Sequence, residues 1–182
     1  MVKYQRVRQS INAISFLYLL WNSESMAKKI LLQIHSEPTY YSLFGISSTL
    51  RDYKLAFRFN KDAEMNMEKK DDFIPFGFPT DVKGGCSLYY WRDEDHFNSF
   101  YFLSNRREGF WIFPEIKQAD FLLLVEGPFT RRQTDQLLKK LRTIPNVQTV
   151  FEIKLASLKN YGQVLNDMEL HMMKIRPKGE KS

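Results

Sequence analysis

Two acidic side chains near the middle of the chain have a spacing at which acid–base chemistry can be considered. Glu115 and Asp120 lie in the segment FPEIKQADF, which occupies positions 113–121. Two carboxylates can act as general acid and general base if the fold brings them into one pocket. Both also have common structural uses, because an acidic residue favours the start of a helical turn and aspartate bonds to backbone amides at corners. The structural interpretation is the stronger one, and a hydrolase or isomerase using this pair is an alternative.

The other reactive side chains are isolated from one another. Cys86 follows two glycines, and without a local base it is better interpreted as part of a turn before a strand. Asp93, Asp95 and His96 form an acidic turn with three potential metal ligands, but the sequence offers no credible fourth ligand. The sequence contains no glycine-rich phosphate loop, zinc spacing or nucleophile elbow. It therefore favours a protein with no catalytic residues, no cofactor and no metal, although it does not decide against an enzyme.

Composition limits the size and the charge of the domain. The 182 residues include 15 Phe and 9 Tyr, which predicts one domain with an aromatic core. The net charge of +6 is concentrated at the two ends of the chain. The central part is nearly neutral, so counting shows no basic face for nucleic acid, although Arg106-Arg107 and Arg131-Arg132 keep that possibility open. One cysteine excludes an intramolecular disulfide and fits a cytoplasmic location.

The ends of the chain differ from its centre. Residues 1–25 combine basic residues with the apolar run 11–21, a pattern too short to span a membrane comfortably. They are interpreted as an upstream extension before a true start at Met26, with a signal peptide or an anchoring arm as alternatives. Residues 26–173 are predicted to form a single α+β domain. Residues 174–182 are predicted to be a basic, disordered tail.

The centre of the domain is predicted to be a β-α-β unit. Phe121–Val125 is an apolar run bracketed by acidic residues, which indicates a buried strand. A capping box and an apolar stripe predict a helix over 130–143, and alternation predicts a strand over 147–155. Pro114 suits the start of a short helical turn that leads into the buried strand.

Shorter elements are predicted on both sides of this unit. We expect strands at 29–34 and 65–70, a hairpin formed by 87–92 and 97–105, and a closing helix within 156–173. Residues 40–46 are expected to be extended or part of a binding loop. Thr49 is predicted to cap a helix that carries Leu50, Tyr53, Ala56 and Phe57 on one face. The aromatic loop 73–79 can cover a ligand, but more often such a loop covers the protein's own core.

Together these elements predict an α+β fold with a mixed or antiparallel sheet and two main helices on one face. The order of elements is similar to a ferredoxin-like plait with an inserted β-hairpin. A half-open barrel built from the same strands is the alternative.

The central segment resembles the signature of the IPExxxVDY family, a group of small bacterial proteins named for that motif. Pro114, Glu115 and Asp120 match the motif, whereas Phe113, Ala119 and Phe121 stand where it has Ile, Val and Tyr. The resemblance extends over roughly residues 29–153 and includes Gly45–Ser48, Leu50–Leu55, Asn60-Lys61 and the Leu103–Asn105 strand end. It implies no known activity, and Phe121 lacks the phenolic hydroxyl of the family's tyrosine.

The function that these observations favour is that of a small cytoplasmic binding or adaptor domain, without a membrane span, for an unknown protein or small ligand. Its expected contact residues are Phe113, Pro114, Glu115, Asp120 and Phe121, together with the aromatic loop. An RNA- or ribosome-associated protein is the alternative, in which exposed aromatic side chains of the sheet stack on bases. The side chains available for stacking would be Tyr89, Trp91, Tyr101 and Trp111.

Overall fold

The computed structural model describes residues 41–175. The predicted extension 1–25, the predicted strand 29–34 and most of the predicted tail therefore lie outside the described residues. Six strands form the main sheet: β1 (Tyr41–Ser48), β2 (Glu68–Phe73), β3 (Cys86–Asp93), β4 (Asn98–Ser104), β7 (Phe121–Glu126) and β8 (Val147–Ile153). The helices are α2 (Asp52–Asp62), α3 (Arg131–Arg142) and α4 (Tyr161–Ile175). A small ribbon of β5 (Arg106–Arg107) and β6 (Phe110–Trp111), and the 3-10 turns η1 (Pro114–Ile116) and η2 (Leu155–Ser157), complete the described part.

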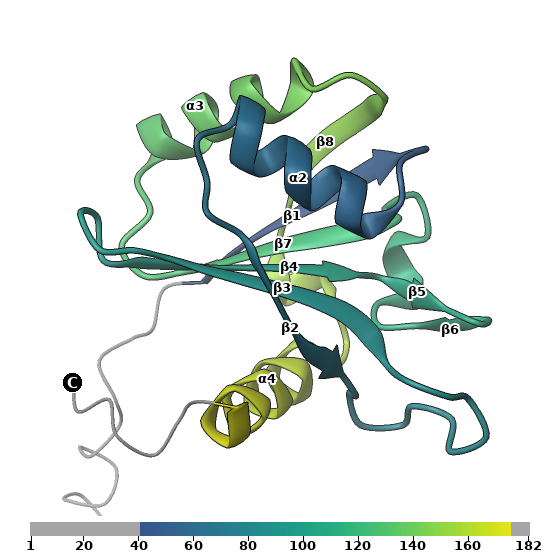
Figure 1. The fold of residues 1–182 in the computed structure, drawn as a ribbon. Coiled ribbons are helices and arrows are strands. Elements are labelled where there is room, and N and C mark those ends of the chain that lie inside the picture. Colours follow the sequence, from purple (N-terminus) through teal and green to yellow (C-terminus); the bar gives the residue numbers. More distant parts are fainter. Residues whose placement is uncertain (1–40, 176–182) are drawn as a thin grey trace, which may run out of the picture. The chain divides into compact units, whose positions relative to one another are not determined.

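The sheet is antiparallel throughout, in the order β2-β3-β4-β7-β1-β8. Because β7 and β8 both run antiparallel to β1, the unit β7-α3-β8 has β1 between its two strands. In the same way, β1 and β4 enclose β7. These two interleaved units define a ferredoxin-like plait, and α2 and α3 lie together on one face of the sheet (Figure 1). The expected α+β fold is confirmed.

The inserted part of the sheet differs from the prediction. The hairpin β3-β4 was expected to be the insertion, but β4 is a strand of the plait itself, and β2 with β3 extends the sheet beside it. The predicted strand 65–70 is shifted toward the C-terminus and forms as β2, and Met65 and Met67, which precede it, are buried in the core. The sheet remains open at β2 and β8 and carries helices on both faces, which favours the layered α+β fold over the alternative of a half-open barrel.

Helix α3 forms as its sequence predicts. The Thr130 hydroxyl accepts a hydrogen bond from the Gln133 amide, and the Gln133 side chain accepts one from the Thr130 amide at 2.9 Å. This reciprocal cap satisfies two of the four backbone donors that begin a helix. The apolar stripe of the helix is buried against the sheet, through Leu137, Leu138 and Leu141.

Helix α2 also forms, but its predicted cap is wrong, and of its predicted apolar face only Ala56 is buried and Leu50 partly buried. The N-cap residue is Arg51, which makes no side-chain capping bond, and Thr49 lies outside the helix. Tyr53 and Phe57 are 53% and 63% exposed. The sheet instead receives the opposite side of the helix, which carries Leu55, Ala56 and Phe59. Both sides of the helix carry apolar residues, so the sequence pattern alone does not decide which side is buried.

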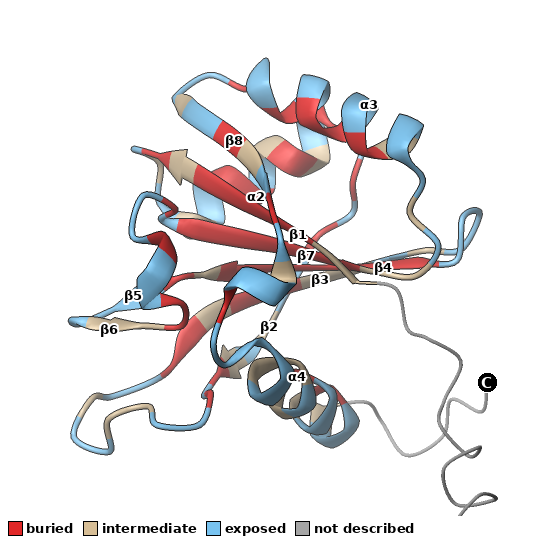
Figure 2. Ribbon diagram, turned by 180° about the vertical axis from the view of Figure 1, so that it is seen from behind, coloured by how far each residue is buried: buried red, intermediate tan, exposed pale blue. Residues whose placement is uncertain are grey.

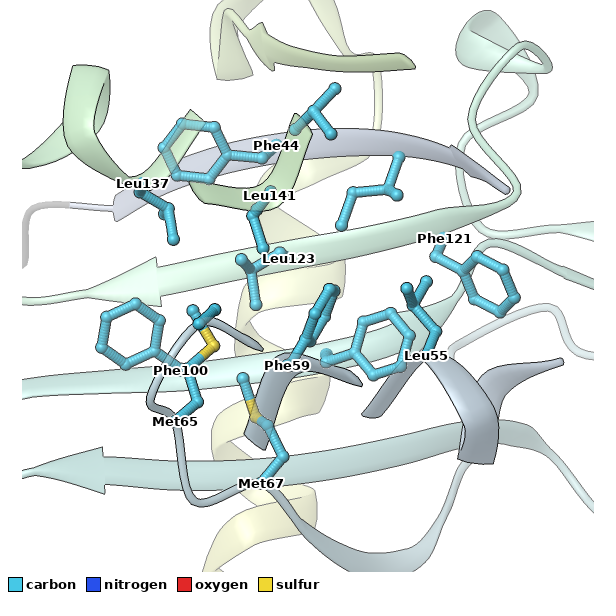
Figure 3. Close-up of a cluster of buried hydrophobic side chains, with 14 of the residues drawn as sticks. Phe44, Leu55, Phe59, Met65, Met67, Phe100, Phe121, Leu123, Leu137 and Leu141 are labelled. Atoms are coloured by element: carbon cyan, nitrogen blue, oxygen red, sulfur yellow. The ribbon is translucent and has the colours of Figure 1, made fainter. Parts of the chain in front are cut away.

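Two cores lie on opposite faces of the sheet. The core under α2 and α3, which we call the helix-layer core, contains Phe44, Phe59 and Leu141 (Figure 3). Phe102 belongs to the same core. The core under α4 contains residues such as Leu122 and Met168. The central strands are therefore buried on both sides, as Figure 2 shows.

Helix α4 confirms the predicted closing helix and reaches Ile175, two residues into the predicted tail. Its buried side consists mainly of Met168 and Met172. Three hydrogen bonds join α4 to β1, to β2 and to the loop after β2. They link the Tyr41 hydroxyl with Glu169, the His171 ring with the Asp71 carbonyl, and the Asp167 carboxylate with the Phe76 amide.

The two edge strands differ in how they are protected. Strand β2 is mostly charged, which discourages pairing with another chain. Strand β8 is less polar, but the Arg142 guanidinium donates to its Val150 carbonyl at 2.8 and 3.3 Å. A carbonyl occupied in this way is not available to a further strand.

Candidate functional site

The predicted contact residues of the central motif divide into buried and exposed groups. Phe113 and Phe121 are 3% and 7% exposed, and they belong to the two cores on opposite faces of the sheet. Pro114, Glu115 and Asp120 are exposed. Pro114 begins the turn η1, as its sequence predicts. The structure therefore does not gather these five residues into one surface.

A buried asparagine that precedes the motif holds it in place. The Asn105 side chain is fully buried and accepts a hydrogen bond from the Phe113 amide at 3.0 Å. Its amide nitrogen donates to the carbonyls of Ala119 at 2.9 Å and Ile116 at 3.4 Å. Sequence reasoning noted Asn105 only as part of a strand end. The sequence signal that could have identified it is an asparagine directly after an apolar strand. A buried polar side chain at such a position needs hydrogen-bond partners, which the backbone of the following loop supplies.

The two motif carboxylates bond to separate parts of the chain. Glu115 accepts from the backbone amide of Lys159, before α4. Asp120 accepts from the Ser48 amide at 3.0 Å and from the Ser47 hydroxyl at 3.1 Å, at the end of β1. They share no hydrogen-bond partner among the described residues. Because Glu115 bonds only to backbone within that range, these contacts count against an acid–base pair.

The thiol of Cys86 is buried and has little nucleophilic character. It lies on the α4 side of the sheet at the start of β3 and is 0% exposed. Burial, and secondarily the Asp72 carboxylate, raises the pKa of Cys86 from 9.0 to about 12. A thiol that stays protonated at neutral pH does not attack an electrophile.

This shift predicts a loss of stability at alkaline pH. The unfolded thiol ionises near pH 9 and the folded thiol only near 12, so the stabilisation present below pH 9 is lost as the pH rises between these values. We expect the free energy of unfolding of the wild type to fall toward that of Cys86→Ala by about 1.4 kcal/mol per pH unit. Urea unfolding of both proteins at pH 8 to 11 measures the difference. Parallel curves would contradict the expectation.

The aromatic side chains considered for base stacking are mostly covered. Tyr89 and Tyr101 are 7% and 4% exposed. Trp91 is partly buried and stacks on Phe100, with ring centroids 4.9 Å apart. Trp111 is also partly buried, with the Arg106 guanidinium 5.6 Å from its ring centroid. Both faces of the sheet carry helices (Figure 1). Burial of these side chains counts against stacking of bases on the sheet.

A row of polar side chains crosses the α4 side of the sheet, and sequence reasoning missed it. Tyr41, Glu126, Ser99 and Arg92 are successive cross-strand neighbours on β1, β7, β4 and β3. The Tyr101 hydroxyl donates to Glu126. No local signal marks this row, because its members come from four strands and meet only through the register of the sheet.

The phenols beside this row remain protonated. Burial, followed by the nearby Glu126 and Glu169 carboxylates, raises the pKa of Tyr41 well above its ordinary value. Burial and the hydrogen bond to Glu126 raise the pKa of Tyr101 in the same direction. Burial raises the pKa of Tyr89, on the other face, to about 12. Phenols in this state donate hydrogen bonds and do not act as bases near neutral pH.

The acidic hairpin turn is closed by its own hydrogen bonds. Asp93 accepts from the amides of Asp95 and His96, and its second oxygen lies 2.8 Å from the His96 ring. Within residues 41–175, no group of three or more His, Cys, Asp or Glu side chains has the arrangement to hold a metal ion.

Large apolar side chains are exposed around α4. Ile74 and Phe76, in the loop after β2, are 61% and 81% exposed. The backbone amide of Phe76 donates to Asp167 on α4 at 2.8 Å, so the loop lies against this helix. Leu170 and Met173, one and two turns further along the helix, are 57% and 71% exposed. We call Ile74, Phe76, Leu170 and Met173 the apolar α4 surface.

Comparison of the chain with protein-family models and with curated proteins finds no match. The resemblance to the IPExxxVDY family therefore stays a prediction. In the part of the chain that the structure describes, no helix combines the length and apolar character needed to cross a membrane.

Proposed function

We propose that this chain is a non-catalytic binding domain whose partner is a protein. The exposure of the apolar α4 surface is the observation that supports this function most directly. Single exposed apolar residues are ordinary on protein surfaces, but adjoining ones often mark an interaction site. The exposed motif residues remain a second proposed contact region. A cytoplasmic location and membership of the IPExxxVDY family remain part of the proposal.

The charges around the apolar α4 surface indicate the chemistry of the partner. The loop 71–85 and helix α4 carry five acidic side chains and two basic ones: Asp71, Asp72, Asp81, Asp167 and Glu169 against Lys83 and Lys174. A partner that fits would bring apolar side chains to the centre and basic ones to the rim. Such an arrangement favours encounter as well as specificity.

The contacts of the reactive groups support a binding role over a catalytic one. The Glu115 and Asp120 carboxylates cap backbone in different places, and the Cys86 thiol is buried. The phenols of the polar row are protonated donors. The carboxylates and phenols therefore hold backbone or neighbouring side chains in the fold, and the thiol is enclosed in the core.

Affinity capture with paired surface variants tests the proposal. The full-length wild type, Ile74→Ser/Phe76→Ser and Phe97→Asn would be used to capture proteins from native lysate with and without nuclease. Phe97 is a matched control, because it is 71% exposed on a distant hairpin, and its φ of 55° suits asparagine. We expect a nuclease-resistant partner that binds the wild type and Phe97→Asn but is lost with the double variant. Captured proteins that do not depend on Ile74 and Phe76 would overturn the proposal.

A further inference from the structure

The outward side of α2 and α3 has a charge opposite to that of the α4 side. Segments 51–64 and 131–142 carry nine basic and four acidic side chains. Figure 1 shows the two helices together on one face of the sheet, and most of their charged side chains are exposed. The near-neutral charge of the domain therefore conceals a basic face, which counting along the sequence did not reveal.

The acidic residues of this face are already occupied. Asp62 pairs with Arg58 at 3.4 Å, Asp135 with Arg131 at 3.1 Å, and Glu64 with Lys140. Asp52 accepts a hydrogen bond from the buried Tyr89. Five exposed cations have no ion pair among the described residues: Arg51, Lys54, Lys61, Arg132 and Lys139. These charges are available to an anionic partner.

Two aromatic side chains lie among these cations. Tyr53 and Phe57 are one helical turn apart on α2 and are 53% and 63% exposed. Phe57 follows Lys54 by three positions and precedes Lys61 by four, so all three share one side of the helix. The two lysines are roughly 10 Å apart along the helix axis, with the aromatic ring between them.

We propose that this face of α2 and α3 binds single-stranded nucleic acid. Proteins that bind single strands combine cations that contact the phosphates with aromatic side chains on which bases stack. The order cation, aromatic, cation on α2 supplies both contacts. A duplex offers its phosphates but not its base faces, so it would leave Tyr53 and Phe57 without a role. A lipid surface requires a broad apolar face, and the apolar side of α2 is buried in the core.

Fluorescence anisotropy on the full chain tests the proposal. The probes are labelled 12-nucleotide oligouridylate and oligothymidylate, titrated at several salt concentrations, with anionic phosphatidylserine vesicles and a 12-base-pair duplex as comparison ligands. We expect saturable binding to the single strands that weakens with salt, and weaker binding to the duplex and to the vesicles. The two single strands distinguish RNA from DNA as the preferred ligand.

Variants separate this face from the basic termini of the chain. We expect Lys54→Glu/Lys61→Glu to weaken binding at least tenfold and to reduce the logarithmic salt slope by about 1.4, at about 0.7 per phosphate contact. Phe57→Ser should weaken binding about tenfold with little change in slope, the effect of losing one stacked base. Circular dichroism and thermal melting establish that each variant is folded.

Matched controls lie elsewhere on the domain. Lys83→Glu/Lys117→Glu reverses two exposed lysines outside this face, and Phe97→Asn removes an exposed aromatic side chain. Both should bind as the wild type does. Equal losses in the control and test variants would overturn the proposal, as would the absence of single-strand binding. A preference for vesicles or for the duplex would likewise overturn it and would assign the basic face to that ligand.

Discussion

Replacing Asn105 with alanine is expected to lower the free energy of unfolding by about 4 kcal/mol, a large part of the stability of a domain of this size. The side chain is fully buried and bonds to three backbone groups of the motif segment. Alanine would leave these groups buried without partners, and each such group costs about 1 to 3 kcal/mol.

Urea unfolding followed by circular dichroism measures this loss. Asn105→Asp keeps an acceptor for the Phe113 amide but cannot donate to the two carbonyls, and it should also be strongly destabilised. Ser104→Ala is the control, because Ser104 is the neighbouring residue and bonds mainly to the Ser87 hydroxyl. A loss below about 1 kcal/mol for Asn105→Ala, similar to that of the control, would show that the motif does not depend on this side chain.

Replacing Phe102 with alanine is expected to cost about 4 kcal/mol as well, for a different reason. Phe102 is fully buried on β4, in the helix-layer core. Its ring packs against those of Phe59, Phe121 and Tyr89, with centroid distances of 4.9, 5.4 and 5.7 Å. Figure 3 shows Phe59 and Phe121 within this core. Alanine would leave a cavity, and these neighbouring side chains, which come from three different elements, cannot move together to fill it.

The unfolding midpoint in urea should decrease while the slope stays unchanged, since the mutation alters stability and not the extent of unfolding. Phe102→Leu should fall between the wild type and alanine. Phe76→Ala is the matched control, because this phenylalanine is 81% exposed and its truncation should change stability by less than about 0.5 kcal/mol. Equal effects of Phe102→Ala and Phe76→Ala would contradict the described core.

These two variants also separate architecture from binding. Asn105 and Phe102 stabilise the interior of the domain. Replacing either one should lower the free energy of unfolding and so reduce binding at every surface of the domain. Phe57 and Phe76 lie on different surfaces, and each should affect only its own ligand. A variant that loses binding while its unfolding curve is unchanged therefore identifies a contact residue.

The elements encoded by local patterns were predictable from the sequence. The signals for helix α3, which are its capping box, its apolar stripe and its end, all lie in one short stretch of the sequence. The structure confirms all three. Strand β7 and the hairpin β3-β4 were equally clear, because apolar runs and turn residues are local signals. The α+β class and the plait followed from the order of these elements along the chain.

The candidate site was predictable only in part. The sequence singled out Glu115, Asp120 and the aromatic loop, but it did not show that Asp120 bonds to Ser48, which is 72 positions away. It also placed Tyr53 and Phe57 on the same helical face as Ala56, whereas the structure buries Ala56 and exposes the two aromatic side chains. Burial depends on which faces meet, and a periodic pattern with two apolar sides does not decide that.

The sequence by itself determined the identity and order of the main elements, the aromatic character of the core and the isolation of the single cysteine. Only the tertiary structure decided that β4 belongs to the plait, that Asn105 holds the motif, and that five exposed cations lie together on α2 and α3, opposite an acidic, apolar side. The physical reason is that these features arise from contacts between distant segments. Hydrogen bonds, burial and surface charge depend on the register of the strands and on the faces that the helices cover. No local stretch of the chain determines that register or those faces.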